Sequence, residues 1–265
     1  MKGAFGNEGA LLPFFLSISL AIVRLFTVMS RFSITVLVSA TVVLIAFGLC
    51  FFGVWIPNEP SSASYPLRGI DVSHHQKEIH WKLVKARNIH FTYIKATEGA
   101  DFKDPKFFEN WSESGAVDLV HGAYHFFTLG TSGKLQASNF IATVPIEPNA
   151  LPPAIDLEFS GYNKTHTQAP QDFQRELSIF WDTILTHYGK TPVVYTTKDF
   201  QKQYLPQMPL ERLWIREVIL KPRQDWIFWQ FSARGRVNGI STFVDLNVFN
   251  GTDTDFQSLL GMGRN

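Results

Sequence analysis

The chain has 265 residues, of which 45% are hydrophobic and 18% charged, and a formal net charge of +1. This composition is too apolar for a disordered protein, and the length suits one sizeable domain with an appendage. A net charge this close to zero, without a cluster of Lys and Arg along the sequence, argues against a nucleic-acid partner.

The N-terminal part contains an uncharged apolar run from Ile34 to Ile56. At about 1.5 Å per residue, a helix of this length crosses a hydrocarbon core of about 30 Å, so the run predicts a transmembrane helix. A cleavable signal peptide has a shorter apolar region of about 7 to 15 residues, so we prefer an uncleaved anchor to a signal peptide cut near residues 61–64. Basic residues precede the run and Glu59 follows it. The positive-inside rule therefore places the rest of the chain outside the cytoplasm.

Three further features belong to this N-terminal part. The apolar run from Ala10 to Val23 is short for a span and is followed by Arg24, which suits an interfacial segment. Translation from Met29 is an alternative, because the sequence from this residue resembles the start of a signal anchor. Cys50 is the only cysteine. We interpret it as a small apolar residue of the helix and not as a lipid attachment site, so the exported part has no disulfide.

The composition changes at residue 57. We predict that residues 1–56 form a cytoplasmic segment and the anchor, 57–67 a linker, and 68–265 one domain. The sequence PNEPSSASYP is rich in Pro and Ser and predicts a short, fairly stiff connection.

From residue 67, short apolar runs alternate with amphipathic segments. Eight runs have the length and composition of β-strands, and they begin at Leu67, Phe91, His121, Pro152, Pro192, Arg212, Trp226 and Phe243. Helical patterns lie between several of them, at residues 104–115, 132–144 and 169–189. The later connections are short, so helices are expected to be missing there. This alternation predicts an α/β fold, namely a TIM-type barrel of eight strands with an incomplete ring of helices.

Asp156 and Glu158 lie two residues apart in the strand PPAIDLEF. Alternate residues of a strand face the same side, so both carboxyl groups are expected in the mouth of the barrel, where strand ends carry the chemistry. Their backbone positions are about 6.6 Å apart, from which the side chains reach the separations used in glycoside hydrolysis. Like charges this close raise the pKa of one group, so that one carboxyl stays protonated as a general acid while the other is ionised.

Other polar and aromatic side chains occupy similar positions on the remaining strands. The candidates to converge on this mouth are Asp71, Lys95, Glu98, His125, Tyr195, Gln230 and Asp245, with the aromatic residues Tyr93, Tyr124, Phe127 and Trp214. Aromatic faces beside carboxylates suit a sugar ring, although aromatic residues of a barrel more often belong to the core. The sequence has no pattern for acyl transfer, nucleotide binding or zinc, so we predict no metal and no cofactor.

Eight blocks resemble glycoside hydrolase family 25, the Chalaropsis-type lysozymes or N-acetylmuramidases. In order they are GIDVSHHQ, FTYIKATEG, HGAYHFF, PPAIDLEF, PVVYTT, LWI, WIFWQFS and VDLNVFNG, and they cover Arg68 to Gly251. The resemblance implies a flattened barrel with fewer than eight helices. It also implies hydrolysis of the β-1,4 bond between N-acetylmuramic acid and N-acetylglucosamine in peptidoglycan glycan strands, outside the cytoplasmic membrane of a bacterium.

The resemblance also assigns roles by matching position. It implies that Glu158 is the general acid, and that Asp156 stabilises the developing positive charge or orients the acetamido group of the substrate. Asp71 and Asp245 match the other two active-site aspartates of the family. Read from the sequence alone, Asp71 also suits an acceptor for backbone donors, and Asp245 with Asn247 suits a turn.

The sequence departs from the family pattern at two places. His75 stands where an aromatic residue is common, and Arg216 and Glu217 stand where small or apolar residues are usual. We expect Arg216 to pair with Glu217 rather than to bind an acidic peptide stem, because ion pairs at strand ends are common and weak.

Two other functions remain as alternatives. One is a catalytically inactive, membrane-anchored scaffold that binds peptidoglycan, and the other is a hydrolase of another acetamido-polysaccharide such as chitin. The presence of all four carboxylates favours an enzyme over the scaffold, because a binding module does not need a paired acid.

Overall fold

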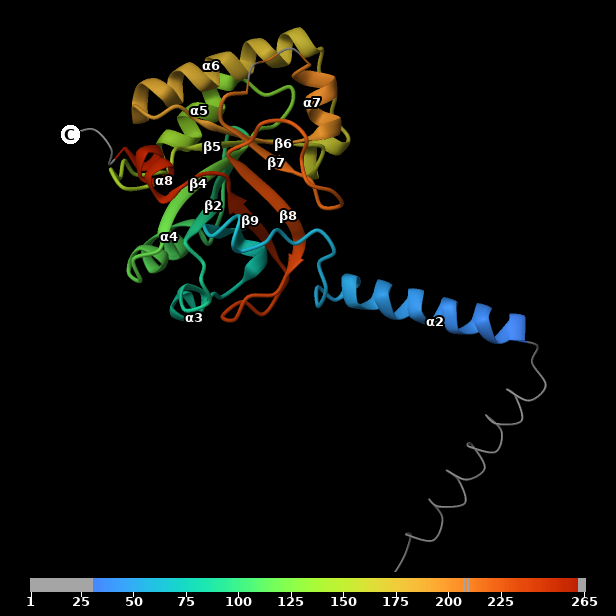
Figure 1. Cartoon of the computed structure of the whole chain (residues 1–265). Coiled ribbons are helices and arrows are strands. Elements are labelled where there is room, and N and C mark those ends of the chain that lie inside the picture. The colour runs from blue at the N-terminus through green and yellow to red at the C-terminus, as the bar shows by residue number, and fades with distance from the viewer. Residues whose placement is uncertain (1–30, 207, 209, 262–265) are drawn as a thin grey trace, which may run out of the picture. The chain divides into compact units, whose positions relative to one another are not determined.

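The computed structural model describes residues 31–206, 208 and 210–261, and the chain forms two units, Met1–Trp55 and Ile56–Asn265 (Figure 1). The first unit contains helix α2 (Arg31–Phe51), which has no charged residue after Arg31. Its stretch Ser33–Phe51 is long and apolar enough to cross a membrane, a test that a signal sequence also passes. The predicted cytoplasmic segment, with its apolar run from residue 10 to 23 and the alternative start at residue 29, lies outside the described residues.

The second unit is built on a closed barrel of eight strands. These are β1 (Arg68–Val72), β2 (Phe91–Glu98), β4 (Val120–Phe126), β5 (Ala154–Leu157), β6 (Val193–Thr197), β7 (Leu213–Arg216), β8 (Phe228–Gly235) and β9 (Val244–Phe249). The order around the barrel is β1-β9-β8-β7-β6-β5-β4-β2, and the pairing of β2 with β1 closes it. The two-residue strand β3 (Phe102–Lys103) pairs with the end of β2. The predicted eight-stranded barrel is confirmed.

The barrel differs from a fully parallel one in its last strand. β9 runs antiparallel to both of its neighbours, β1 and β8, whereas the other pairs around the barrel are parallel. The segment between β8 and β9, residues 236–243, is shorter than the dozen or more residues that a parallel crossover requires. This short connection therefore turns the last strand back as a hairpin.

Helices surround the barrel only in part. They are α3 (Trp81–Lys85), α4 (Phe107–Gly115), α5 (Gly133–Ile141), α6 (Pro170–Tyr188), α7 (Lys198–Tyr204) and α8 (Asp253–Leu260), with single turns η1 (His74–Gln76) and η2 (Gly161–Lys164). The longest, α6, begins with a Pro and ends at Gly189, whose φ of 65° is readily adopted by glycine. Within the described residues no helix follows β7 or β8 before the next strand, so the ring is incomplete as expected.

Aromatic side chains fill the interior of the barrel below its mouth. The ring of Tyr93 stacks on Trp214 with centroids 4.8 Å apart, and Phe91 lies 5.1 Å from Phe228. A Cβ atom on Gly69 would come within 2.3 Å of the Phe91 ring. The Phe91 ring therefore occupies the space that a side chain at position 69 would need. This filling leaves polar side chains to line the open end, where the parallel strands terminate.

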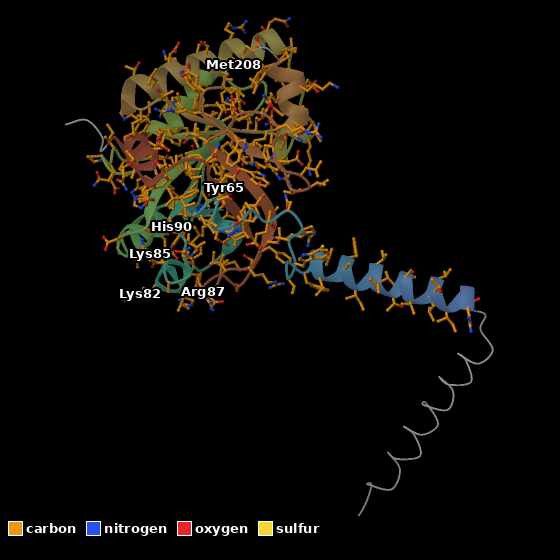
Figure 2. All side chains as sticks on the ribbon, viewed as in Figure 1. Tyr65, Lys82, Lys85, Arg87, His90 and Met208 are labelled. Atoms are coloured by element: carbon orange, nitrogen blue, oxygen red, sulfur yellow. The ribbon has the colours of Figure 1, made fainter. Side chains whose placement is uncertain are left out.

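The residues that precede β1 pack on the strands that have no outer helix. Ile56 and Tyr65 pack against a buried cluster made by Leu213, Ile215, Trp226, Trp229, Phe231 and Val248. Tyr65 lies over the barrel (Figure 2), with its ring centroid 5.5 Å from that of Trp226. The Nδ2 amide of Asn58 donates a hydrogen bond to the carbonyl oxygen of Glu217 at 3.3 Å. The predicted linker, 57–67, therefore has fixed contacts with the barrel.

Candidate active site

A cleft lies at the C-terminal ends of the parallel strands. It consists of two adjoining cavities, of about 420 and 320 Å³, which share six lining residues, Asp71, Tyr124, Asp156, Glu158, Ser160 and Asp245. The structure therefore brings all four predicted carboxyl groups into one place, between the two halves of the cleft. We call the half that also contains Arg216 the first lobe, and the half that contains Lys95 the second lobe.

Asp156 and Glu158 lie at the end of β5. Asp156 belongs to the strand and Glu158 directly follows it, so the alternation of the strand carries both side chains into the cleft. Burial raises the pKa of Asp156 well above its usual value, and the negative charge of Glu158 raises it further. Burial also raises the pKa of Glu158, against the opposing effects of the Arg216 charge and a hydrogen bond with Ser160. One oxygen of Asp156, Oδ1, is buried and has no hydrogen-bond partner among the described residues.

Asp71 is held by two amide groups on neighbouring strands. Its Oδ2 atom accepts hydrogen bonds from Gln230 Nε2 at 3.0 Å and from Asn247 Nδ2 at 2.7 Å. Burial nevertheless raises the pKa of Asp71 to about 6, because these two bonds offset only part of the loss of solvent. Asp245 is the partner of Asp71 in the register of β1 and β9. Its pKa is raised well above the usual value by burial and by the charge of Asp71.

The two amides are oriented by aromatic donors. The hydroxyl of Tyr195 donates to Gln230 Oε1 at 3.0 Å, and the indole Nε1–H of Trp214 donates to Asn247 Oδ1 at 2.8 Å. Because each amide oxygen is occupied in this way, each amide nitrogen points at Asp71. Asn247 lies in β9, within the predicted strand that begins at Phe243 and not in the turn considered as an alternative, two residues after Asp245 and on the same face. That spacing of two was the signal by which it could have been identified as a site residue.

The second lobe holds three of the predicted binding residues. Lys95, Glu98 and Tyr124 line it together with His75. Lys95 Nζ lies 2.6 Å from Glu98 Oε2 and 5.2 Å from the centre of the Phe126 ring. The charge of Lys95 lowers the pKa of Asp156, though less than burial and Glu158 raise it.

Three predicted binding residues lie outside the lining of the cleft. Tyr93 is buried deeper in the barrel, where its hydroxyl donates to the carbonyl oxygen of Pro152 at 3.1 Å. His125 faces the helices, with its ring stacked 4.8 Å from that of Phe180 and its two nitrogens bonded to Thr97 and Gln136. Phe127 packs in the same outer core. Their burial leaves no surface for a sugar, so a substrate contact does not fit these positions.

The predicted pair between Arg216 and Glu217 is not formed. Neighbouring residues of a strand point to opposite sides, and Glu217 pairs instead with Lys198. Arg216 lines the first lobe with Lys164 and Ser160 and forms no ion pair within 4.0 Å in the part of the chain that the structure describes. Sequence reasoning missed Ser160 and Lys164, which follow β5 in a loop and the turn η2, where no periodic pattern marks the residues that face a cleft.

The fold and the cleft together define a class of protein. An eight-stranded barrel with buried, paired carboxyl groups at its mouth is typical of glycoside hydrolases. Within the described residues no group of three or more His, Cys, Asp or Glu side chains is arranged to hold a metal ion.

Comparison with known proteins identifies the family. The model of glycosyl hydrolases family 25 matches residues 70–240, and the chain belongs to this family. It is 35% identical to the protein YegX of Escherichia coli K12 over 219 residues, which are 79% of this chain and 77% of YegX. It is 32% identical to lysozyme M1 of Streptomyces globisporus, with 70% of this chain and 68% of the lysozyme covered. The solved structure of a family 25 glycosyl hydrolase from Bacillus anthracis superposes with a TM-score of 0.71 at 36% identity, over 76% of this chain and 96% of that one.

Proposed function

We propose that the protein is a muramidase that hydrolyses the β-1,4 bond between N-acetylmuramic acid and N-acetylglucosamine in peptidoglycan. Membership of family 25 makes it a glycoside hydrolase, and one of its relatives is a lysozyme by name. The observation that carries the proposal is the unpartnered, buried Oδ1 atom of Asp156, which lines the cleft with Glu158. A buried acceptor without a donor is costly, and a substrate with an acetamido N–H supplies the missing donor.

Glu158 is the general acid of this proposal. Its raised pKa keeps the carboxyl group protonated at a pH where an exposed glutamate is ionised. It donates this proton to the glycosidic oxygen as the bond to the anomeric carbon breaks, which removes the charge from the leaving group. The resulting carboxylate then accepts a proton from the water that completes hydrolysis.

Asp156 orients the acetamido group of the muramic acid residue. Its Oδ1 accepts the acetamido N–H, which turns the acetamido carbonyl oxygen toward the anomeric carbon. As the glycosidic bond breaks, this oxygen forms a new bond to the same carbon, and water later displaces it. Asp71 on β1 and Asp245 on β9 also line both lobes, and as carboxylates they stabilise the positive charge that develops on the sugar ring.

The residues that bind the glycan line the two lobes. We assign this role to Tyr195, Trp214 and Gln230 in the first lobe, to Lys95 and Glu98 in the second, and to Tyr124 in both. Tyr195 and Trp214 also fix the amides that hold Asp71, so their contribution is partly one of positioning.

We further infer that residues 34–56 anchor the protein in the cytoplasmic membrane of a bacterium, with the barrel on the outer side. Helix α2 supports this inference by its length and composition. The proposed division is a membrane segment up to residue 56, a connection at 57–67 and the catalytic barrel from 68 to 265. Mass spectrometry of the protein purified from membranes tests the anchor, because a cut signal peptide leaves a chain that lacks residues 34–56.

A digestion experiment tests the proposed reaction. Purified peptidoglycan is incubated with the full chain, with Glu158→Gln and with Glu113→Gln, which removes an exposed carboxylate on α4. The products are reduced with borohydride and identified by mass spectrometry. We expect reduced muramic acid ends from the parent and from Glu113→Gln, and a rate about 10²–10⁴-fold lower for Glu158→Gln, because the general acid is lost.

Other outcomes of this experiment select the alternatives. Retained binding to peptidoglycan without new ends from any variant would indicate a scaffold. Cleavage of chitin oligosaccharides together with intact peptidoglycan would indicate a hydrolase of another acetamido-polysaccharide.

A further inference from the structure

The loop after β7 carries an unusual exposed surface. Val218, Ile219 and Leu220 are consecutive, and their exposed fractions are 39, 75 and 60%. In the described part of the second unit, the other large apolar side chains with comparable exposure stand singly along the chain. Single exposed apolar residues are common, whereas a contiguous group marks a contact surface.

The base of this loop is fixed to the barrel. The carbonyl oxygen of Glu217 accepts hydrogen bonds from Asn58 Nδ2 at 3.3 Å and from Trp229 Nε1 at 2.7 Å. On the other side of the apolar tip, Lys221 Nζ lies 5.4 Å from the centre of the Tyr65 ring. Contacts on both sides therefore hold the loop so that its tip points away from the core.

The base of the loop is bonded to a residue that closely follows the apolar helix in the chain. The helix ends at Phe51, and backbone hydrogen bonds from Val54 and Trp55 to the carbonyl oxygen of Leu49 form a capping turn around Gly53, whose φ is 66°, so that residues 54 and 55 stay next to the last turn of the helix. Asn58 follows Trp55 by three residues, and three residues span at most about 11 Å. The chain that connects the helix to the residue bonded to the base of the loop is therefore short. If the helix spans a bilayer, Trp55 lies at its surface, where tryptophan is favoured.

The charges around the tip suit a lipid surface. Lys221 follows the apolar residues directly and Arg223 follows two residues later, whereas Asp225 is the next acid along the chain and Glu217 is already paired with Lys198. Apolar side chains beside cations are the combination that binds a membrane interface, because the apolar groups enter the headgroup region and the cations attract anionic lipids.

We propose that residues 218–223 form a second membrane contact, on the outer surface of the bilayer that holds α2. The proposal rests on the inferred anchor and is independent of the reaction catalysed. Arg216 lines the cleft and stands two residues before the exposed tip. The contact therefore holds the rim of the cleft beside the lipid headgroups and directs the enzyme to glycan next to the membrane.

Spin labels at three positions of the full chain test the contact. In a Cys50→Ser background, single cysteines replace Ile219, Ile146 and Ile45, and the labelled proteins are reconstituted in nanodiscs of phosphatidylethanolamine and phosphatidylglycerol. Ile146 is the matched control, an isoleucine of the barrel with 62% exposure, and Ile45 lies in α2 with 58% exposure. Collisions with oxygen report lipid, and collisions with a water-soluble nickel chelate report solvent.

We expect the labels at 219 and 45 to collide more often with oxygen, and less often with the nickel chelate, than the label at 146 does. A label at 219 that behaves like the label at 146, with the label at 45 in lipid, would overturn the contact and leave the anchor intact. A label at 45 in solvent would overturn both. In either event the digestion experiment above still decides the reaction, because it does not depend on lipid.

Discussion

Asp71 and Asp245 lie directly opposite each other on the antiparallel strands β1 and β9, so two buried carboxyl groups share one rung of the barrel. Burial raises the pKa of both, and the charge of Asp71 raises that of Asp245 further. Such a pair destabilises the folded state when both groups are ionised. A site arranged for chemistry commonly lowers stability in this way.

Replacement of Asp71 by asparagine is expected to stabilise the protein at neutral pH and to abolish hydrolysis. The pKa of Asp71 is about 6 in the folded protein against a usual value of 3.8, so the folded state holds the proton more tightly. Well below pH 3.8 the group is neutral in both states, and its contribution to stability is lost as the pH rises from 3.8 through about 6. The loss for this one group is about 3 kcal/mol. Asp71→Asn removes it, because the asparagine Oδ1 still accepts hydrogen bonds from Gln230 and Asn247.

Thermal unfolding of the full chain in detergent between pH 4 and 7 measures this effect. The melting temperature of Asp71→Asn should fall less steeply with pH than that of the parent and should be higher at pH 7. Asp182→Asn, which changes an exposed aspartate of α6, is the control and should follow the parent. Equal slopes for the parent and Asp71→Asn would contradict the buried, high-pKa state of Asp71.

The role assigned to Asp156 predicts a requirement for one acetamido group. Peptidoglycan whose muramic acid residues have been deacetylated lacks both the N–H that Asp156 Oδ1 accepts and the carbonyl oxygen that reaches the anomeric carbon. We expect it to be cut at least about 10²-fold more slowly, since an interaction made at the reacting centre is lost. Glycan deacetylated only on glucosamine is the matched control and should be cut at nearly the normal rate. Equal rates on the two substrates would remove Asp156 from this role.

Much of the fold was predictable because its signals are local. Apolar runs of strand length and the turns between them marked all eight strands, and short late connections marked the missing helices. Asp156 and Glu158 were placed together by the same local rule, since residues two apart on a strand share a face. The partner of Glu217 was not predictable, because Lys198 comes from the start of α7 and meets it only in the closed barrel.

The faces of β4 show why some of the predicted binding residues lie outside the lining of the cleft. Tyr124 and His125 are adjacent, so only one of them faces the cleft. The strand is buried on both sides, by the interior on one and by helices on the other, and apolar residues therefore occur on both faces. Because neither face of the strand is exposed to solvent, the sequence does not reveal which set of alternate residues points into the barrel. Tyr93 lies below the cleft for another reason, since the depth of a residue inside the barrel depends on how the strands are staggered.

This alternation gives a paired prediction. Phe127→Leu should lower the free energy of unfolding by about 1–2 kcal/mol, because it leaves a small cavity beside Phe173 and Phe180. Its kcat/KM on peptidoglycan should stay within about twofold of the parent, since a change limited to the outer core does not alter transition-state binding. Tyr124→Leu, three residues earlier on the inward face, should instead lower kcat/KM because Tyr124 lines both lobes. Denaturant unfolding and steady-state kinetics on the two variants measure the contrast, and a raised KM for Phe127→Leu would contradict the outward placement.

Arg216 is expected to set the pH range of the enzyme. Its positive charge lowers the pKa of Glu158, Asp71 and Asp245, in each case against a larger effect of burial. Replacement by methionine removes the charge and so raises these pKa values. Both limbs of the pH profile of kcat/KM should then move to higher pH. The acidic limb moves because Asp71 and Asp245 ionise at a higher pH, and the basic limb moves because Glu158 loses its proton at a higher pH.

Lys164→Met is the matched control for this charge. Lys164 lines the same lobe, but its charge does not contribute among the main causes of the shifts in these carboxyl groups, so the limbs should keep their positions. Initial rates on soluble glycan fragments with and without peptide stems, measured across pH for both variants, separate two roles of Arg216. Unmoved limbs together with a higher KM only for stem-bearing glycan would show that Arg216 binds the acidic stem, and that its field is too well screened by solvent in the open cleft to tune the carboxyl groups.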